Sequence, residues 1–173
     1  ELFGIRSDRF TDGHRFHAPG KIAVESPEAY ERKLREAGVI VDPAARRRSV
    51  REQLLALAAE AGRTLVEDAR LEEEVTNLVE WPVVVRGEFD RKFLALPPEV
   101  TITVMARHQR YFAVKDGGGA LLPCFMAVAN MDPAFDARGA AARDEILRRR
   151  AAMTRGYERV LTARLEDGVF FFE

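Results

Sequence analysis

The chain has 173 residues, 47% of them hydrophobic, and its 27 basic and 28 acidic side chains leave a formal net charge of −1. This balance argues against a uniformly basic nucleic-acid-binding domain, although it allows a local basic face. No apolar run approaches the ~20 residues of a membrane span. The single cysteine, Cys124, excludes a disulfide within the chain and is typical of a reducing cytosol. The first residues carry no initiator Met and no signal-peptide pattern, which indicates a piece of a longer protein.

Three helices are predicted in the first half of the chain. Ser26-Pro27 and Asp42-Pro43 are both typical of a helix start, and they predict helices over 27–37 and 43–61, each followed by a glycine. A third helix is predicted over 69–79, with Leu71, Val75, Leu78 and Val79 directed inward. Residues 39–41 are either a short buried strand or the lead-in to the second helix.

Strands are predicted in the second half. The β-branched run 83–85 favours a strand. The apolar runs 111–114 and 121–129 flank Asp116-Gly117-Gly118-Gly119, which predicts a β-hairpin with a glycine turn. Residues 98–109 fit a strand or a helix. These elements predict an α+β fold, a mixed and largely antiparallel sheet flanked by helices. We expect a single domain over 1–173, with a mixed core at 1–133 and a mainly helical arm at 134–173.

Charge is unevenly distributed along the chain. Residues 46–51 form a basic cluster, and 138–164 carry eight arginines against three acids, so the predicted arm could follow a phosphate backbone. The alternative is a solvated helix face supported by ion pairs. The acidic run Glu72-Glu73-Glu74 is interpreted as solvated helix surface.

Few residues indicate catalysis. His14-x-x-His17 offers too few ligands for an ordinary zinc site. Cys124 lies in an apolar strand, where a lone cysteine is usually a small buried hydrophobe. We therefore predict no catalytic and no metal-binding residues.

Six strings, in order along the chain, resemble the beta subunit of bacterial heterotetrameric glycyl-tRNA synthetase. They are Gly13-His14-Arg15-Phe16, the stretches 78–84 and 93–97, the pattern Met105-x-x-His108-Gln109-x-Tyr111-Phe112, the stretch 121–130, and Glu158-Arg159-Val160-Leu161 with the residues to Phe172. The resemblance implies an internal fragment of a longer cytoplasmic subunit, similar to the B3/B4-type module of the phenylalanyl-tRNA synthetase beta subunit. It also implies glycine tRNA, the alpha subunit and the remaining beta-subunit domains as partners. ATP and Mg would act on the alpha subunit, with no cofactor in this fragment.

The resemblance brings a set of polar residues forward as RNA-binding candidates. Arginines could reach phosphates, and the histidines, Gln109 and Tyr111 could contact unpaired bases. The full set is His14, Arg15, Arg107, His108, Gln109, Arg110, Tyr111, Arg148, Arg149, Arg150, Arg159 and Arg164. For His14, His108 and Gln109 the alternative is buried structural hydrogen bonding. The aromatic residues of the same strings are expected in the core: Phe16, Trp81, Phe112, Phe125 and Phe170–Phe172.

Three hypotheses for the function remain open at this point. The first is a noncatalytic tRNA-recognition and scaffolding domain supporting glycyl-tRNA formation. The second is a hydrolytic editing module, by analogy with the phenylalanine system, although glycine is the smallest amino acid and larger ones can be excluded sterically. The third is a domain that contacts only other protein parts.

Overall fold

The structure is a computed structural model that describes residues 3–4, 8–60, 62–130, 155 and 159. The three helices predicted in the first half of the chain are present. Asp42 accepts hydrogen bonds from the backbone N–H groups of Ala44 and Ala45, and Asp68 caps its helix through Leu71 N–H. The helices are α1 (Pro27–Glu36), α2 (Pro43–Ala59), α3 (Ala69–Leu78) and the short α4 (Pro98–Thr103).

Two antiparallel sheets complete the fold. A two-stranded sheet pairs β1 (Phe10–Asp12) with β2 (Lys21–Ala23). A four-stranded sheet has the order β3-β5-β6-β4, built from β3 (Thr64–Leu65), β4 (Val83–Glu88), β5 (Tyr111–Lys115) and β6 (Leu121–Ala129). The predicted hairpin at 111–129 and strand at 83–85 are confirmed, and so is the α+β class. The likeness to a B3/B4-type module remains a prediction.

Successive side chains of β5 and β6 pack against different helices, because strand side chains alternate between two faces. Phe112 and Met126 face α2 and α3, whereas Ala113 and Ala127 face the opposite layer. That second layer is formed by η1 (Arg91–Ala95), α4 and the π-helix η2 (Val104–Gln109). The larger sheet is therefore covered on both faces. This explains why its central strands are apolar runs without polar alternation.

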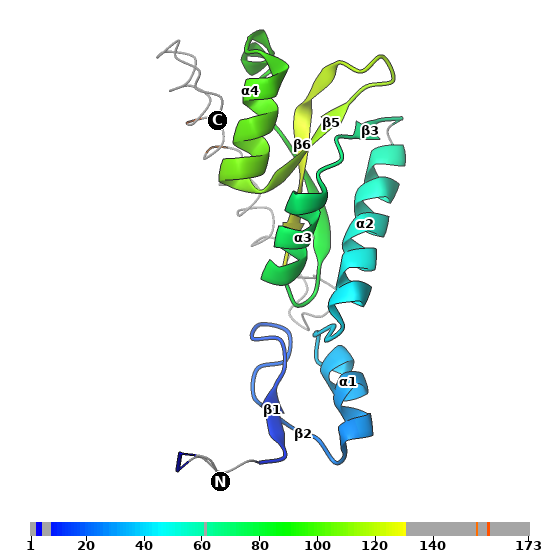
Figure 1. Ribbon diagram of the computed structural model, residues 1–173, viewed down its shortest axis with the longest axis vertical. Coiled ribbons are helices and arrows are strands. Elements are labelled where there is room, and N and C mark those ends of the chain that lie inside the picture. Colours follow the sequence, from blue (N-terminus) through cyan, green and yellow to red (C-terminus); the bar gives the residue numbers. More distant parts are fainter. Residues whose placement is uncertain (1–2, 5–7, 61, 131–154, 156–158, 160–173) are drawn as a thin grey trace.

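The small β1–β2 sheet and α1 lie at one end of the molecule, away from the β5–β6 turn (Figure 1). A two-stranded sheet is marginal on its own, so its attachment to the larger sheet matters. One attachment is the backbone hydrogen bond from Ile40 N–H to Glu80 O, which fixes the link between α1 and α2. Residues 39–41 form no strand. They are the lead-in to α2, which was the second of the two predicted alternatives.

Residues 98–109 are helical, which decides the ambiguity left by the sequence. The helix continues from α4 into η2, and Val104 and Met105 fill the core from it. Leu78, expected to point inward, is 59% exposed, because α3 ends there and the extended Val79 turns into the core instead. The predicted helical arm and Phe170–Phe172 lie outside the described residues, apart from Arg155 and Arg159.

Candidate functional site

His14 is fully buried where the β1–β2 loop meets the end of the larger sheet. Its Nδ1 accepts from the backbone N–H groups of Phe16 and His17, at 3.3 Å each. Nε2 lies 2.9 Å from the carbonyl oxygen of Asn130, the residue after β6. An Nδ1 that accepts two hydrogen bonds leaves the proton on Nε2, which donates to that carbonyl. Both ring nitrogens of His14 therefore serve the fold, and its full burial keeps it away from any surface that RNA could reach.

The same loop exposes the two residues after His14. Arg15 is exposed, and its guanidinium carbon lies 5.2 Å from the centre of the Phe16 ring. Phe16 is 47% exposed, so its assignment to the core is wrong. The interior position at this corner is taken by His14, which leaves the Phe16 ring outside. The signal available in the sequence was the flanking of Phe16 by polar residues without any helical or strand periodicity.

A second group of candidates lies at the end of η2. Arg107 and His108 are exposed, whereas Gln109 is partly buried. Arg110 follows in the left-handed conformation with φ of 57°, and its Nε donates to a carboxylate oxygen of Glu74 at 2.6 Å. π-Helical turns and left-handed non-glycine residues are uncommon and concentrate at functional sites. This turn brings Arg107, His108 and Arg110 together on the surface.

Tyr111 begins β5 and points into the core. Its ring stacks on Phe125 with 4.2 Å between centroids and 6° between planes. Burial raises the pKa of Tyr111 to about 12. The structure thus separates Tyr111 from the exposed candidates that precede it.

The raised pKa of Tyr111 predicts an alkaline loss of stability. The folded chain holds the phenol proton more tightly than the unfolded chain, whose tyrosines titrate near 10. The stabilisation is therefore complete below pH 10 and is lost as pH rises from 10 to about 12. Urea unfolding at pH 8, 10 and 11 should show a steeper decline for the wild type than for Tyr111→Phe. Equal slopes would contradict the prediction, and Tyr30→Phe, at an exposed ring, is the control.

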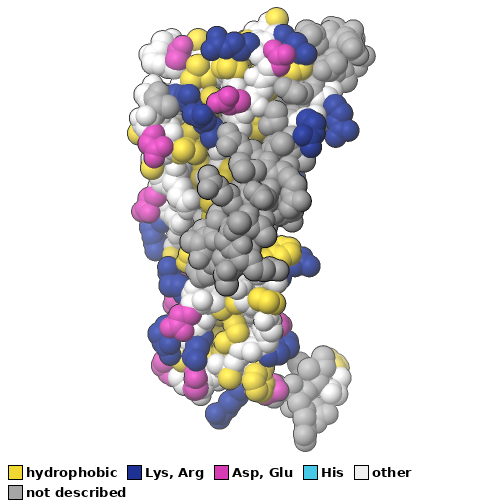
Figure 2. Space-filling view, turned by 180° about the vertical axis from the view of Figure 1, so that it is seen from behind, with side chains coloured by type: hydrophobic (Ala, Val, Ile, Leu, Met, Phe, Trp, Pro, Cys, Tyr) yellow, Lys and Arg dark blue, Asp and Glu magenta, His cyan; other side chains and the backbone are white. Residues whose placement is uncertain are grey.

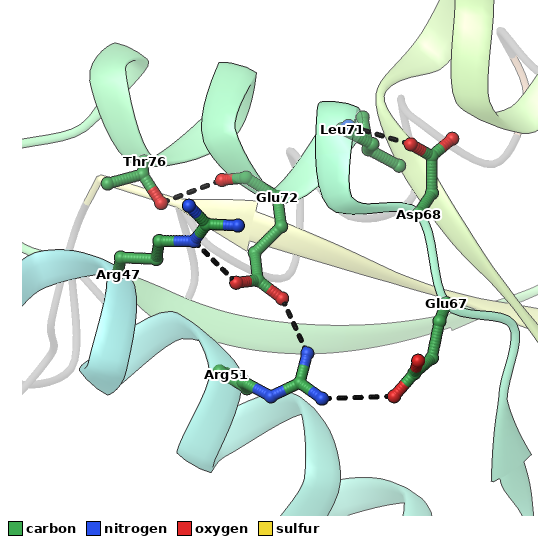
Figure 3. Close-up of polar contacts among 7 residues, drawn as sticks. All are labelled: Arg47, Arg51, Glu67, Asp68, Leu71, Glu72 and Thr76. Atoms are coloured by element: carbon green, nitrogen blue, oxygen red, sulfur yellow. Dashed lines mark hydrogen bonds and ion pairs between the residues drawn. The ribbon is translucent and has the colours of Figure 1, made fainter. Parts of the chain in front are cut away.

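The basic cluster at 46–51 is largely occupied within the fold (Figure 3). Arg47 and Arg51 each pair with one carboxylate oxygen of Glu72, at 2.8 and 3.0 Å, and Arg51 also pairs with Glu67. Arg46 donates to the carbonyls of residues 40, 41 and 76. Glu72 is buried, so its assignment to solvated surface is wrong, although Glu73 is exposed as expected. The spacing of residues along α3 did not reveal that α2 supplies two arginines to this position.

The remaining basic candidates belong to the predicted arm. Arg159, together with Arg155, is helical and exposed. The others lie outside the described residues: Arg148, Arg149, Arg150 and Arg164. Basic and acidic side chains are interspersed over the face shown in Figure 2, which agrees with the near-zero net charge.

Cys124 lies in the core between β6 and the α2–α3 layer, and burial raises the pKa of its thiol. A raised thiol pKa lowers the fraction of reactive thiolate. In the part of the chain that the structure describes, no cluster of three or more histidine, cysteine or acidic side chains could hold a metal ion. None of the described helices is long and apolar enough to cross a membrane.

Comparison with known proteins identifies the family. The family model of the glycyl-tRNA synthetase beta subunit matches residues 1–173. The chain is 42% identical over 173 residues to the glycine–tRNA ligase beta subunit of Desulforamulus reducens, covering 100% of this chain and 23% of that protein. The chain belongs to the glycyl-tRNA synthetase beta subunit family. The homologues of Myxococcus xanthus and Bacillus subtilis are 44% and 40% identical over 173 and 172 residues, each covering 99% of this chain and 23% of the relative.

Family membership confirms the resemblance drawn from the six strings. Two of these strings fall at the two surfaces, since Gly13–Phe16 begins the β1–β2 loop and residues 105–112 run from η2 into β5. The chain spans 23% of the length of the glycine–tRNA ligase beta subunits it matches.

Proposed function

We propose that this chain is a noncatalytic domain of a glycine–tRNA ligase beta subunit that contacts glycine tRNA and thereby supports ATP-dependent aminoacylation on the alpha subunit. The observation that carries the proposal is the surface at the end of η2. Arg107 and His108 are exposed there beside Arg110, whose left-handed backbone and pairing with Glu74 hold the turn in place. Cationic side chains on a held turn suit the recognition of phosphates.

Arg107 is the residue best placed for a phosphate. Among the described residues it has no ion-pair partner, whereas Arg110 is already paired with Glu74. Binding of an RNA phosphate by Arg107 would release condensed counterions without breaking an existing ion pair. Arg110 would add a second positive charge nearby, although the carboxylate of Glu74 partly neutralises that charge.

The burial of Cys124 and His14 favours binding over hydrolysis at these two residues. Cys124 is buried with a raised pKa, and both ring nitrogens of His14 are engaged by backbone groups. An editing reaction needs a nucleophile or base within reach of a substrate. Neither residue meets this requirement in the fold described above.

The proposal is tested with Arg107→Glu in the whole enzyme, assembled with its alpha subunit. We expect the KM for glycine tRNA to rise about 10-fold or more, because the charge reversal removes the contact between Arg107 and a phosphate and places a negative charge there instead. Glycine-dependent ATP–pyrophosphate exchange, which needs no tRNA, should be unchanged. The slope of log tRNA affinity against log salt concentration should become shallower by about one, the contribution of a single phosphate contact.

Arg48→Glu is the matched control. Arg48 is an exposed arginine on α2, the helix that covers the opposite face of the larger sheet. Among the residues that the structure describes, its ion pair is the long 3.9 Å contact with Asp42. We expect its KM for tRNA to match that of the wild type. Equal tRNA kinetics for Arg107→Glu and Arg48→Glu would overturn the role of the η2 surface.

A scaffolding role is the second candidate, and a different surface favours it. An open hollow of about 560 Å³ lies between the start of β1 and the start of α1, and the exposed rings of Phe10 and Tyr30 line it. Aromatic side chains are enriched at protein–protein contacts. If this hollow receives another part of the enzyme, Phe10→Ala should lower the assembled fraction measured by sedimentation and leave the tRNA affinity of assembled enzyme unchanged.

A further inference from the structure

We propose that Arg15 and Phe16, at the tip of the β1–β2 loop, form a binding site for one unpaired RNA nucleotide. The Phe16 ring would stack on the base and the Arg15 guanidinium would meet the adjoining phosphate. This inference rests on the proposed tRNA-binding function and names a contact surface separate from the η2 turn. It concerns a ring that sequence patterns had assigned to the core.

The first observation is an exposed ring beside a positive charge. Phe16 is 47% exposed, and the Arg15 guanidinium lies 5.2 Å from its centroid. The other cation–π pair in the described residues joins Lys92 to Phe93, whose ring is buried. Only the pair in the β1–β2 loop therefore offers ring surface to a ligand. Aromatic rings that accept bases next to cations that meet phosphates are the usual means of binding single-stranded nucleic acid.

The second observation is that the loop is held in place before any ligand binds. The ring of the buried His14 accepts hydrogen bonds from the backbone N–H groups of Phe16 and His17. The backbone N–H of His14 donates to the carbonyl oxygen of Ala37 at 2.9 Å. The carbonyl of His14 accepts from Ala18 N–H at 2.8 Å. A loop fixed by four hydrogen bonds, two between backbone groups and two to the His14 ring, loses little conformational entropy when a ligand binds.

Close packing at two glycines strengthens this support. A Cβ on Gly13 would lie 2.8 Å from side-chain atoms of both Ala37 and Ile22. Gly38 has φ of +75°, and a Cβ there would lie 3.2 Å from the Cβ of His14. The β1–β2 loop thus packs closely against the C-terminal end of α1. The exposed position of Phe16 follows from this packing.

Charge favours RNA over a protein partner. Between residues 13 and 24 the chain carries Arg15 and Lys21 and no acidic residue, so a phosphate would meet no local repulsion within the loop. Lys21 is partly neutralised by Asp12 at 2.8 Å, which leaves Arg15 as the main positive charge. A base in a duplex is already stacked on both sides and unavailable to the ring. The ligand is therefore an unpaired nucleotide.

The test measures binding of a glycine tRNA transcript and of a 12-nucleotide single-stranded RNA to the whole enzyme. We expect Phe16→Ala to weaken both about 5- to 100-fold, the range for loss of one base–aromatic stack. Phe16→Leu, which keeps an apolar side chain without a ring, should resemble Phe16→Ala. Phe16→Trp should restore the affinity, and its added fluorescence should be quenched by the single strand but not by a duplex of the same composition.

Leu55→Ala is the control, since Leu55 is an apolar side chain on α2 with a similar exposed fraction of 44%, and its RNA affinity should equal that of the wild type. The subsite is overturned if Phe16→Ala binds RNA like Leu55→Ala, or if it impairs subunit assembly instead. If Arg107→Glu still weakens tRNA binding in that case, the proposed function stands without this subsite. If neither variant changes RNA affinity, both proposals fail.

Discussion

Replacement of Gly87 by alanine is expected to destabilise the fold by about 3 kcal/mol, within the range for forcing extra volume into a packed core. Gly87 lies on β4 directly opposite Phe125 on β6. A Cβ at this position would fall 2.6 and 2.7 Å from two carbons of the Phe125 ring and nearer still to its Cζ. Atoms cannot approach this closely, so the ring or the strand would have to move.

The ring of Phe125 has no room to move away. Its side chain is fully buried, and Tyr111 stacks on it at 4.2 Å between centroids. The ring is thus confined between Tyr111 and the open backbone of Gly87. Any displacement towards Tyr111 would disturb the core on the η1–α4 side of the sheet.

Denaturant unfolding of Gly87→Ala and Gly117→Ala measures this effect. Gly117 lies in the β5–β6 turn, and a Cβ there would meet no atom within 4 Å. We expect Gly117→Ala to stay within about 0.5 kcal/mol of the wild type, as exposed substitutions usually do. Similar denaturation midpoints for the two variants would show that the stability of the fold does not depend on the close approach of β4 to Phe125.

Replacement of His14 by alanine is the second substitution with a large expected effect, about 2–4 kcal/mol. The change leaves the N–H groups of Phe16 and His17 and the carbonyl of Asn130 without their partner. Each buried polar group left unsatisfied costs about 1–3 kcal/mol, and part of this cost is relieved where water reaches the loop. A cavity of imidazole size adds to the loss.

The effect of His14→Ala should be local. Two of the lost hydrogen bonds lie within the β1–β2 loop and one joins the loop to the end of β6, so opening of β1, β2 and α1 becomes easier while β5 and β6 stay paired. Hydrogen exchange should show faster exchange at residues 16–18 with unchanged protection at residues 111–114. His108→Ala, at an exposed histidine on η2, should alter neither region. Uniform loss of protection throughout the sheet would contradict a local role for His14.

Local signals were sufficient for most of the secondary structure. Asp42-Pro43 and Asp68 start helices because a side-chain oxygen satisfies free N–H groups at the first turn. The glycine turn at 117–119 places two apolar runs side by side, and they form β5 and β6. The strands β1, β2 and β3 were not predicted, because two or three residues carry too little periodicity to be recognised.

The candidate site was predicted in part. The string from Met105 to Tyr111 pointed to η2, and the exposed Arg107 and His108 lie there. The same string could not show that Tyr111 turns into the core, because adjacent residues at a helix–strand junction can face opposite directions. The exposure of Phe16 was also hidden, since an aromatic residue in a family motif is compatible with either core or surface.

The sequence by itself determined the helix starts, the central hairpin, the α+β class and, through its motifs, the family. These features depend on neighbouring residues, whose caps, turns and apolar runs act over a few positions. Only the tertiary structure decided that Glu72 is buried between two arginines, that His14 is internal and that Phe16 is exposed. Those outcomes depend on which residues distant in the chain arrive at the same place: α2 brings Arg47 and Arg51 to Glu72, and the end of β6 brings Asn130 to His14.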